Sequence, residues 1–538
     1  MLRNLTERRL LLPEALVVVS LCVAPFSRAQ KSAAPSATPP AATAKSASPL
    51  STLSTAKAQL DHGDLESGEK TLWSILSSEP TNQEALTMLG VIRGRERRYA
   101  EAEALFRRVL QLNPKSVVAS RNLAGALLAQ DKPDDAIQQY NQAIQLSPQD
   151  SDLKIEVAKL DLARGNFAGA LSTLDTIKAA QFPPAAVPLK AASLLGVGRR
   201  SDAQALIPRV QGSSSAALDL AQVFIDADDS AAALKTLSLV NHGLVNPAPK
   251  GVAARVYYLK GRALRQKGET VAAMASFRQA LAADPKSVET LVAMGETFAA
   301  ENKHADSLNM LEKARALSPD SREVLRHLIV EAMEAGQNDR GLEAAQDLQR
   351  KSSELDDRYL VASVMIQQKQ YLPATHLLED YVTQRPQDAK AYLGLGMSYL
   401  SLLRYADARQ ALERSLQLNP NLAEGHYQLG LLAGQQGSRQ EAIEHWQRAV
   451  ELQPHHAQAL FFLGTAYLES GNLPEAESAF QRSLAADPSN MKTEYDLALV
   501  LNKLGKSEEA KQHFERYRSM QEAEHTTAGN PPKPSDHP

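Results

Sequence analysis

The stretch "YADARQALERSLQLNPN" occupies residues 405–421, and two close copies follow it, "RQEAIEHWQRAVELQPH" at 439–455 and "LPEAESAFQRSLAADPS" at 473–489. The copies start 34 residues apart. A fixed period of this length is typical of repeat arrays, in which each copy is one supersecondary unit. We therefore expect one long stack of similar units rather than several unrelated globular domains.

Prolines mark the same period over most of the chain. Proline lacks an N–H group and clashes with the preceding turn, so it ends a helix. Successive prolines lie 34 residues apart within each of three series: Pro80, Pro114 and Pro148; Pro285 and Pro319; Pro386, Pro420, Pro454 and Pro488. Each proline is therefore expected to close one unit.

The unit 389–422 predicts two helices. Tyr392, Leu395 and Tyr399 are spaced i, i+3, i+7 and share one helical face. After a turn near 403–405, Ala408 and Leu412 lie on one face of a second helix. No strand pattern appears, so the fold class is expected to be all-α.

Small residues recur at two positions, counted from the first residue of each unit. The eighth position holds Gly90, Ala124, Ala158, Gly261, Gly295, Gly396, Gly430, Gly464 and Ala498. The twentieth holds Ala102, Ala136, Ala170, Ala203, Ala233, Ala273, Ala374, Ala408, Ala442, Ala476 and Ala510. The twenty-fourth mostly holds a large residue: Phe106, Tyr140, Leu174, Phe277, Leu311, Leu412, Trp446, Phe480 and Phe514. Since glycine inside a helix costs about 1 kcal/mol relative to alanine, this pattern predicts close helix packing against a large side chain.

The period, the small eighth and twentieth positions, the large twenty-fourth and the proline at thirty-two resemble the tetratricopeptide repeat (TPR). The resemblance covers about 50–523 and implies a right-handed α-solenoid superhelix of about fourteen helical hairpins with a concave groove. The match is strongest at 254–321 and in the last four units, good at 83–150, and weaker at 151–253 and 322–354. We expect an N-terminal array, 50–182, and a C-terminal array, 254–523. Prolines and serines interrupt the repeat pattern at 183–253, which predicts degenerate repeats and a hinge.

The two ends of the chain have other compositions. Residues 1–29 have a basic start, a short apolar run and small residues before Gln30, which predicts a cleaved secretory signal peptide and a periplasmic or secreted protein. An uncleaved segment anchored in the inner membrane is the alternative. The Ala/Pro/Ser-rich linker 30–49 and the tail 524–538 are expected to be disordered. Cys22, the single cysteine, would leave with the signal.

The charge is nearly balanced, with 59 Lys+Arg and 62 Asp+Glu. Residues 1–29 hold four basic and two acidic residues, so the mature chain would have 55 against 60. This balance predicts no nucleic-acid partner. After signal cleavage we also expect no stable membrane span.

Motifs for catalysis are missing. Gly505-Lys506-Ser507 resembles the end of a phosphate loop, but Val500 replaces the leading glycine. His455-His456 lacks further metal ligands nearby and is interpreted as part of a solvated loop. The repeats also leave no room for a catalytic domain. We therefore expect no enzyme activity, no cofactor and no metal.

The resemblance implies that the second, fifth, ninth, twelfth and thirteenth positions of each first helix line the groove. Candidate partner-binding residues are therefore the aromatic residues Tyr258, Tyr359, Tyr427, Phe461 and Tyr495 and the basic residues Arg262 and Arg265. Exposed aromatic side chains would anchor a peptide. The alternative is that these aromatic residues only pack neighbouring first helices. The arginines together could hold an acidic ligand, or they are simply solvated.

The resulting hypothesis is a non-enzymatic scaffold of the bacterial cell envelope. It would bind a partner protein or peptide in the groove of the superhelix. The alternative is a periplasmic adaptor that binds envelope polysaccharide or takes part in its export or modification, because aromatic side chains also stack on sugar rings.

Overall fold

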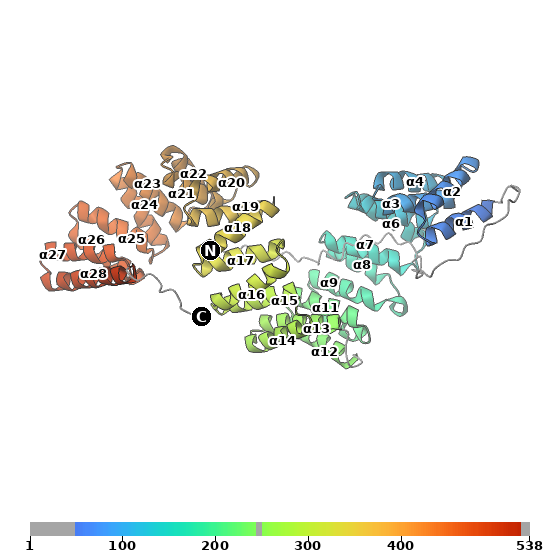
Figure 1. Ribbon diagram of the computed structural model, residues 1–538, viewed down its shortest axis with the longest axis horizontal. Helices are drawn as coiled ribbons and strands as arrows, with labels where there is room; N and C mark the ends of the chain where they lie inside the picture. Colours follow the sequence, from blue (N-terminus) through green and yellow to red (C-terminus); the bar gives the residue numbers. More distant parts are fainter. Residues whose placement is uncertain (1–48, 244–249, 529–538) are drawn as a thin grey trace, which may run out of the picture. The chain divides into compact units, whose positions relative to one another are not determined.

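The computed structural model describes residues 49–243 and 250–528 (Figure 1). Within these ranges the chain is all-α, about 80% helical, with 28 α-helices and no strand. The predicted signal peptide 1–29 and all of the predicted linker 30–49 except its last residue lie outside the described residues. Residues 529–538 of the predicted tail do so as well.

The helices form fourteen pairs, as the period predicts. The first helices are α1 Pro49–Asp61, α3 Gln83–Arg95, α5 Val117–Leu128, α7 Ser151–Ala163, α9 Val187–Gly196, α11 Ser214–Asp226, α13 Lys250–Gln266, α15 Val288–Ala300, α17 Arg322–Glu334, α19 Leu355–Gln367, α21 Ala389–Ser401, α23 Ala423–Gln435, α25 Ala457–Glu469 and α27 Met491–Lys503. The second helices are α2 Leu65–Ser78, α4 Tyr99–Leu112, α6 Pro133–Leu146, α8 Phe167–Asp175, α10 Arg200–Gln204, α12 Ser230–Gly243, α14 Thr270–Ala283, α16 His304–Leu317, α18 Asn338–Lys351, α20 Tyr371–Gln384, α22 Tyr405–Leu418, α24 Arg439–Leu452, α26 Leu473–Ala486 and α28 Ser507–Ala528.

One boundary differs from the prediction. The helix α28 continues to Ala528, so residues 524–528 of the predicted disordered tail are helical. The reason is local, because no glycine or proline follows Gly505 until Gly529.

Each period proline lies two residues beyond the end of a second helix, as Pro114 does after Leu112. The residue two positions further on often caps the next first helix. Ser116 accepts a hydrogen bond from the backbone N–H of Ala119 at 3.3 Å, and Asn490 accepts one from that of Thr493 at 3.1 Å. Such a cap satisfies an N–H group that has no partner inside the helix. The same short segment therefore ends one helix and starts the next.

The predicted packing of small against large residues is confirmed. A Cβ atom added at Gly464 would lie 2.6 Å from the ring of Phe480 in the same hairpin, and one added at Gly90 would lie 2.6 Å from the ring of Phe106. The alanines at the twentieth position are all at most 2% exposed. Among the large residues only Phe514, on the last described helix, is partly exposed. The regular hairpins therefore close around a large side chain that needs a glycine or an alanine opposite it.

The segment 167–243 builds its core in another way. Its second helices α8 and α10 have only 9 and 5 residues, and it contains the 3₁₀ helices η3 Ala179–Gln181, η4 Pro184–Ala186 and η5 Ile207–Val210. Phe167, from the preceding hairpin, packs against Gly196, where an added Cβ would lie 2.1 Å from its ring. Phe224 is fully buried. The hairpins continue here although the repeat pattern is weak.

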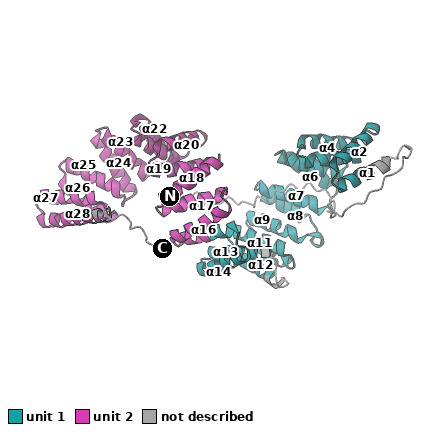
Figure 2. Cartoon of the chain, in the orientation of Figure 1, with its two compact units in different colours: residues 1–293 teal, residues 294–538 magenta. Residues whose placement is uncertain are grey.

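The chain divides into two compact units, residues 1–293 and 294–538 (Figure 2). The boundary lies within α15 and not at the predicted hinge. The described part of 183–253 belongs to the first unit, and residues 244–249 lie outside the described residues. A hinge at 183–253 therefore stays a prediction.

Candidate protein-binding surface

The aromatic residues at the fifth position pack within their own hairpins. Ring centroids lie 5.9 Å apart for Phe461 and Phe480 and 5.7 Å apart for Tyr495 and Phe514. In each of these pairs the partner is the large residue at the twenty-fourth position. Tyr258 packs on Phe277 in the same way, at 6.4 Å. The fifth position thus extends the cluster that closes the hairpin.

Tyr359 and Tyr427 are partly buried and contact other rings. Tyr359 lies 5.2 Å from Tyr381, and Tyr427 lies 4.8 Å from His456 of the next inter-repeat turn. Burial raises the pKa of both Tyr359 and Tyr427 to about 12. Both hydroxyls are therefore uncharged at neutral pH and belong to a largely desolvated layer.

Exposure separates three of the candidate aromatic residues. Tyr495 is 39% exposed, Tyr427 is partly exposed, and Phe461 is only 7% exposed. For Phe461 this favours the packing alternative, because Phe480 and Phe462 cover its ring. Tyr495 keeps an accessible edge although Tyr517 also packs against it, at 5.2 Å. A binding role for Tyr427 and Tyr495 stays a prediction.

The structure does not bring Arg262 and Arg265 together as one anion site. Arg262 donates to Gln222 at 2.9 Å and pairs with Asp226 at 3.3 Å, both on α11. Arg265 instead donates to the backbone carbonyl of Ala293 on α15, at 3.2 Å. The two guanidinium groups therefore point to different helices. Arg262 links α13 to α11, and Arg265 links α13 to α15.

The sequence predicted a solvated loop at His456, and this prediction is wrong for its side chain, because His456 is only 6% exposed. Its Nδ1 accepts a hydrogen bond from the backbone N–H of Ala459, so the imidazole caps α25. Its Nε2 lies 3.3 Å from Glu424. Burial alone would raise the pKa of Glu424, but hydrogen bonds from His456 and Gln428 lower it. His456 occupies the capping place that Asn490 holds one repeat later.

A row of half-buried residues runs along the first helices of the second unit, at the ninth position. All its members are partly exposed, and we call them the position-nine stripe: Glu296, Val330, Ser363, Met397, Leu431, Thr465 and Leu499. Neighbouring first helices such as α19, α21 and α23 contact one another, so the stripe crosses adjacent elements. Four of its members are apolar. The family resemblance places the ninth position on the groove, and the spacing of these residues, 33 or 34 positions, is the signal that identifies them in the sequence.

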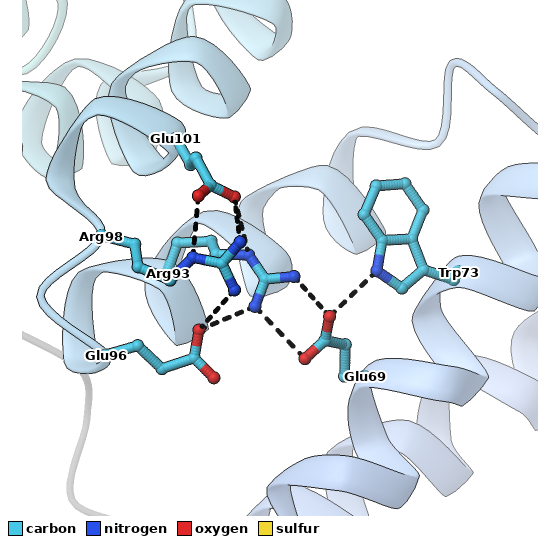
Figure 3. Close-up of polar contacts among 6 residues, drawn as sticks. All are labelled: Glu69, Trp73, Arg93, Glu96, Arg98 and Glu101. Atoms are coloured by element: carbon cyan, nitrogen blue, oxygen red, sulfur yellow. Dashed lines mark hydrogen bonds and ion pairs between the residues drawn. The ribbon is translucent and has the colours of Figure 1, made fainter.

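Ionic contacts link successive hairpins at their surface. One such group surrounds Arg93, whose side chain is 8% exposed and which contacts Glu69 of α2, Glu96 and Glu101 (Figure 3). Trp73 donates its indole N–H to the same Glu69 at 3.1 Å. The hydrogen bonds that Arg93 donates to the carboxylates of Glu69 and Glu96 raise the pKa of Arg93, although burial opposes this. The network stabilises the contact between the first two hairpins and leaves Arg93 fully occupied.

Residues 49–243 and 250–528 contain neither a cluster of metal ligands nor a helix that could span a membrane. No group of three or more His, Cys, Asp or Glu side chains is placed to hold a metal ion. Across the same residues, no helix combines the length and the apolar character needed to cross a bilayer.

Solved structures with similar folds have low identity to this chain. The APC/C hetero-tetramer Cut9–Hcn1 is 14% identical over 84% of this chain and 98% of that chain, with a TM-score of 0.38. MamA from Desulfovibrio magneticus RS-1 is 19% identical over 32% and 97%, with 0.29. PilF from Pseudomonas aeruginosa is 19% identical over 38% and 94%, with 0.32. A search of curated proteins gives no significant match. Because the TM-scores are below 0.5, no functional conclusion rests on them.

Family models agree with the helical hairpins. Models described as tetratricopeptide repeat match residues 53–117, 87–151, 127–192, 254–287 and 427–490. A model described as anaphase-promoting complex, cyclosome, subunit 3, matches 339–415. Together with fourteen helix pairs of the predicted period, these matches show that the chain belongs to the tetratricopeptide repeat family.

Proposed function

We propose that this protein is a non-enzymatic scaffold of the cell envelope that holds a partner protein through the first helices of its second unit. TPR domains are in general protein-interaction modules, which supports a protein partner. The observation that carries the proposal is the position-nine stripe, because Met397, Leu431 and Leu499 present apolar surface at a regular spacing. A partner that covers the exposed part of these apolar side chains removes it from water, and this burial favours binding.

The fixed spacing suits an extended or helical partner segment. Stripe residues on successive first helices repeat with the hairpins, so a ligand that crosses α21, α23 and α25 would meet one side chain per hairpin. Tyr495 and the partly exposed edge of Tyr427 lie four residues before stripe members Leu499 and Leu431, about one helical turn away. The aromatic edges would then flank the apolar contacts.

The envelope location rests on the sequence of residues 1–29, which predicts export. Sequencing the N-terminus of the protein isolated from its own cells tests this part. A mature chain that starts at Gln30 supports export by a cleaved signal, and a chain that retains residues 1–29 in a cytoplasmic fraction contradicts it.

A crosslinking capture from native envelope fractions tests the binding surface. The variant is Met397→Gln, Leu431→Gln and Leu499→Gln, which keeps the side chains long but makes the stripe polar. A matched control carries Val271→Gln, Leu372→Gln and Leu403→Gln, at apolar residues that are 86%, 55% and 66% exposed outside the stripe. Loss of the same captured proteins in the stripe variant alone supports the proposal.

Two other outcomes would change the assignment. Equal capture by both variants and the unmodified protein would place the interface elsewhere on the molecule. Recovery of glycan without protein would favour the polysaccharide adaptor, although the burial of Phe461 removes one of the aromatic residues on which that alternative depended.

A further inference from the structure

A hollow of about 630 Å³ lies in the second unit and is lined by residues of the second helices α20 and α22 and of the first helix α21. Its base consists of Tyr392, Leu395 and Tyr399, which share one face of α21. We call this hollow the Tyr392 groove. None of the position-nine residues lines it.

The repeat explains why the groove is open. Ala411, at the twenty-third position, stands beside Tyr392 in the groove lining and is too small to fill it. One repeat later the twenty-third position holds His445 on α24. Its Nδ1 lies 3.2 Å from that of His426 on α23, the first helix of the same hairpin. His426 and His445 are the equivalents, one repeat later, of Tyr392 and Ala411.

Tyr399 shows what the groove can bind. Its hydroxyl donates to the carboxylate of Glu379 at 2.6 Å, and the guanidinium of Arg404 lies 4.4 Å from its ring centroid. A ring face of this kind attracts cations through its quadrupole. Tyr392, by contrast, is partly exposed, and its side chain has no hydrogen-bond or ring partner among residues 49–243 and 250–528. The second tyrosine therefore offers the same chemistry to an external cation.

The charges of the lining favour a cation as well. The groove lining contains three carboxylates, Glu379, Asp407 and Glu413, and one cation, Arg414. Asp407 pairs with Arg404 at 2.7 Å, outside the lining. Glu413 is 51% exposed and lies 3.8 Å from Arg409, whose shorter contact, 2.6 Å, is to Glu441. Glu413 is therefore the carboxylate that is best placed to pair with a ligand.

We propose that the Tyr392 groove binds an extended peptide segment of a protein partner by accepting a Lys or Arg side chain over the ring of Tyr392, with Glu413 as its counter-ion. This inference rests on the proposed scaffold function but uses a different surface. The volume and the apolar wall residue Val382 leave room for the stem of a long basic side chain. Arginine is the stronger candidate because its planar guanidinium stacks on rings and pairs with carboxylates.

The chain itself supplies the matched substitutions. Two repeats later the equivalent positions are Leu460 for Tyr392, Gln481 for Glu413 and Gln447 for Glu379. Gln447 and Tyr467 are the equivalents of Glu379 and Tyr399, and they also form a hydrogen bond. In this uncharged pair Gln447 donates to the hydroxyl of Tyr467 at 2.8 Å. A neutral-groove variant, Tyr392→Leu with Glu379→Gln and Glu413→Gln, therefore copies side chains that the same fold already tolerates.

The experiment selects short random peptides displayed on phage against the intact protein and measures their affinity for three proteins. These are the unmodified chain, the neutral-groove variant and a filled-groove variant, Ala411→His. The expected peptides are enriched in Arg and Lys, and each variant weakens their binding by about tenfold. The stripe variant (Met397, Leu431 and Leu499 to Gln) should bind these peptides as the unmodified chain does.

Other results would overturn the groove proposal and leave the scaffold function separately testable. Peptides that bind the unmodified and neutral-groove proteins equally, or selected peptides without basic residues, exclude the groove as a cation-reading site. If their binding is lost in the stripe variant instead, the scaffold function stands and only the groove proposal fails. If no peptide is selected, the groove does not act as a peptide site. Hydrogen exchange of α20–α22 confirms that each variant is folded.

Discussion

Two regions of this molecule reach a buried core by different routes. In the hairpins of 389–486 the core repeats, with Gly396 against Leu412, Gly430 against Trp446 and Gly464 against Phe480. In 167–243 the ring that meets a glycine comes from the preceding hairpin, because Phe167 packs on Gly196. The second helices α8 and α10 are short there, yet Phe224 and Ala221 are fully buried.

The difference shows which part of the repeat is essential. Stacking requires that every hairpin cover its neighbour, and both regions satisfy this. The pairing of a glycine with a large residue inside one hairpin is one way to fill the space, and the irregular region replaces it with contacts between hairpins. The regular region should therefore depend more strongly on single side chains within each hairpin.

The largest expected effect is the loss of a large core side chain in the regular region. Phe480→Ala should lower the free energy of opening of α25–α27 by about 3–5 kcal/mol, because Phe480 is fully buried against Gly464. Phe167→Ala should cost less in α8 and α9, since Phe167 is only partly buried. Hydrogen exchange resolves each hairpin, which suits an array that need not unfold in one step. Equal losses of opening free energy in the two variants would show that the two regions do not differ in their dependence on single side chains.

The second prediction adds volume instead of removing it. Gly464→Ala should destabilise the same hairpin by about 1–3 kcal/mol, because the new Cβ would meet Phe480 at 2.6 Å. The gain in helix propensity, about 1 kcal/mol, acts in the opposite direction and is too small to compensate. Adding Phe480→Leu should recover part of the loss, since the chain already combines Ala158 with Leu174 in one cluster. Thermal unfolding checks this, and a stabilised single variant would contradict the close packing.

The third prediction concerns pH and the pair His426 and His445. Burial lowers the pKa of both imidazoles below the ordinary 6.5, so the folded state keeps them neutral. The two neutral imidazoles therefore contribute fully to the stability of the folded state above pH 6.5. This contribution is lost as the pH falls through the folded pKa values, because the unfolded chain binds protons at a higher pH than the folded chain does.

His445→Ala, which installs the residue found at Ala411, should therefore reduce the loss of stability between about pH 7.5 and about pH 5.5. Denaturant unfolding of the second unit at several pH values measures this. Gln440→Ala, at an exposed non-titrating residue on the same helix, serves as the control and should keep the full slope. An unchanged slope in His445→Ala would show that this pair does not set the acid sensitivity.

The smallest effect is expected for an exposed ion pair between regular hairpins. Arg439 and Glu469 lie 2.9 Å apart with both side chains more than half exposed. Arg439→Ala should change stability by no more than about 1 kcal/mol. A larger loss in chemical denaturation would mean that charges, rather than the buried large residues, distinguish the regular region.

Part of the candidate surface was predictable from the sequence and part was not. The family positions located the first-helix face, and Tyr495 is exposed there. Phe461 occupies the same repeat position and is buried. Arg262 and Arg265 share a helix but contact different neighbours. Repeat position therefore predicts the helix and the approximate face, while exposure depends on residues that belong to the adjacent hairpins.

The sequence by itself determined the hairpins, their boundaries and the buried pairs, because these depend on spacing within 34 residues. Proline at 114 ends a helix, and small residues at the eighth and twentieth positions admit the large residue at the twenty-fourth. Only the tertiary structure decided that His456 caps α25, that His445 meets His426, and that Ala411 leaves a groove above Tyr392. The physical reason is that the space around a side chain is set by neighbouring helices, and a regular period does not specify which residue each of them contributes.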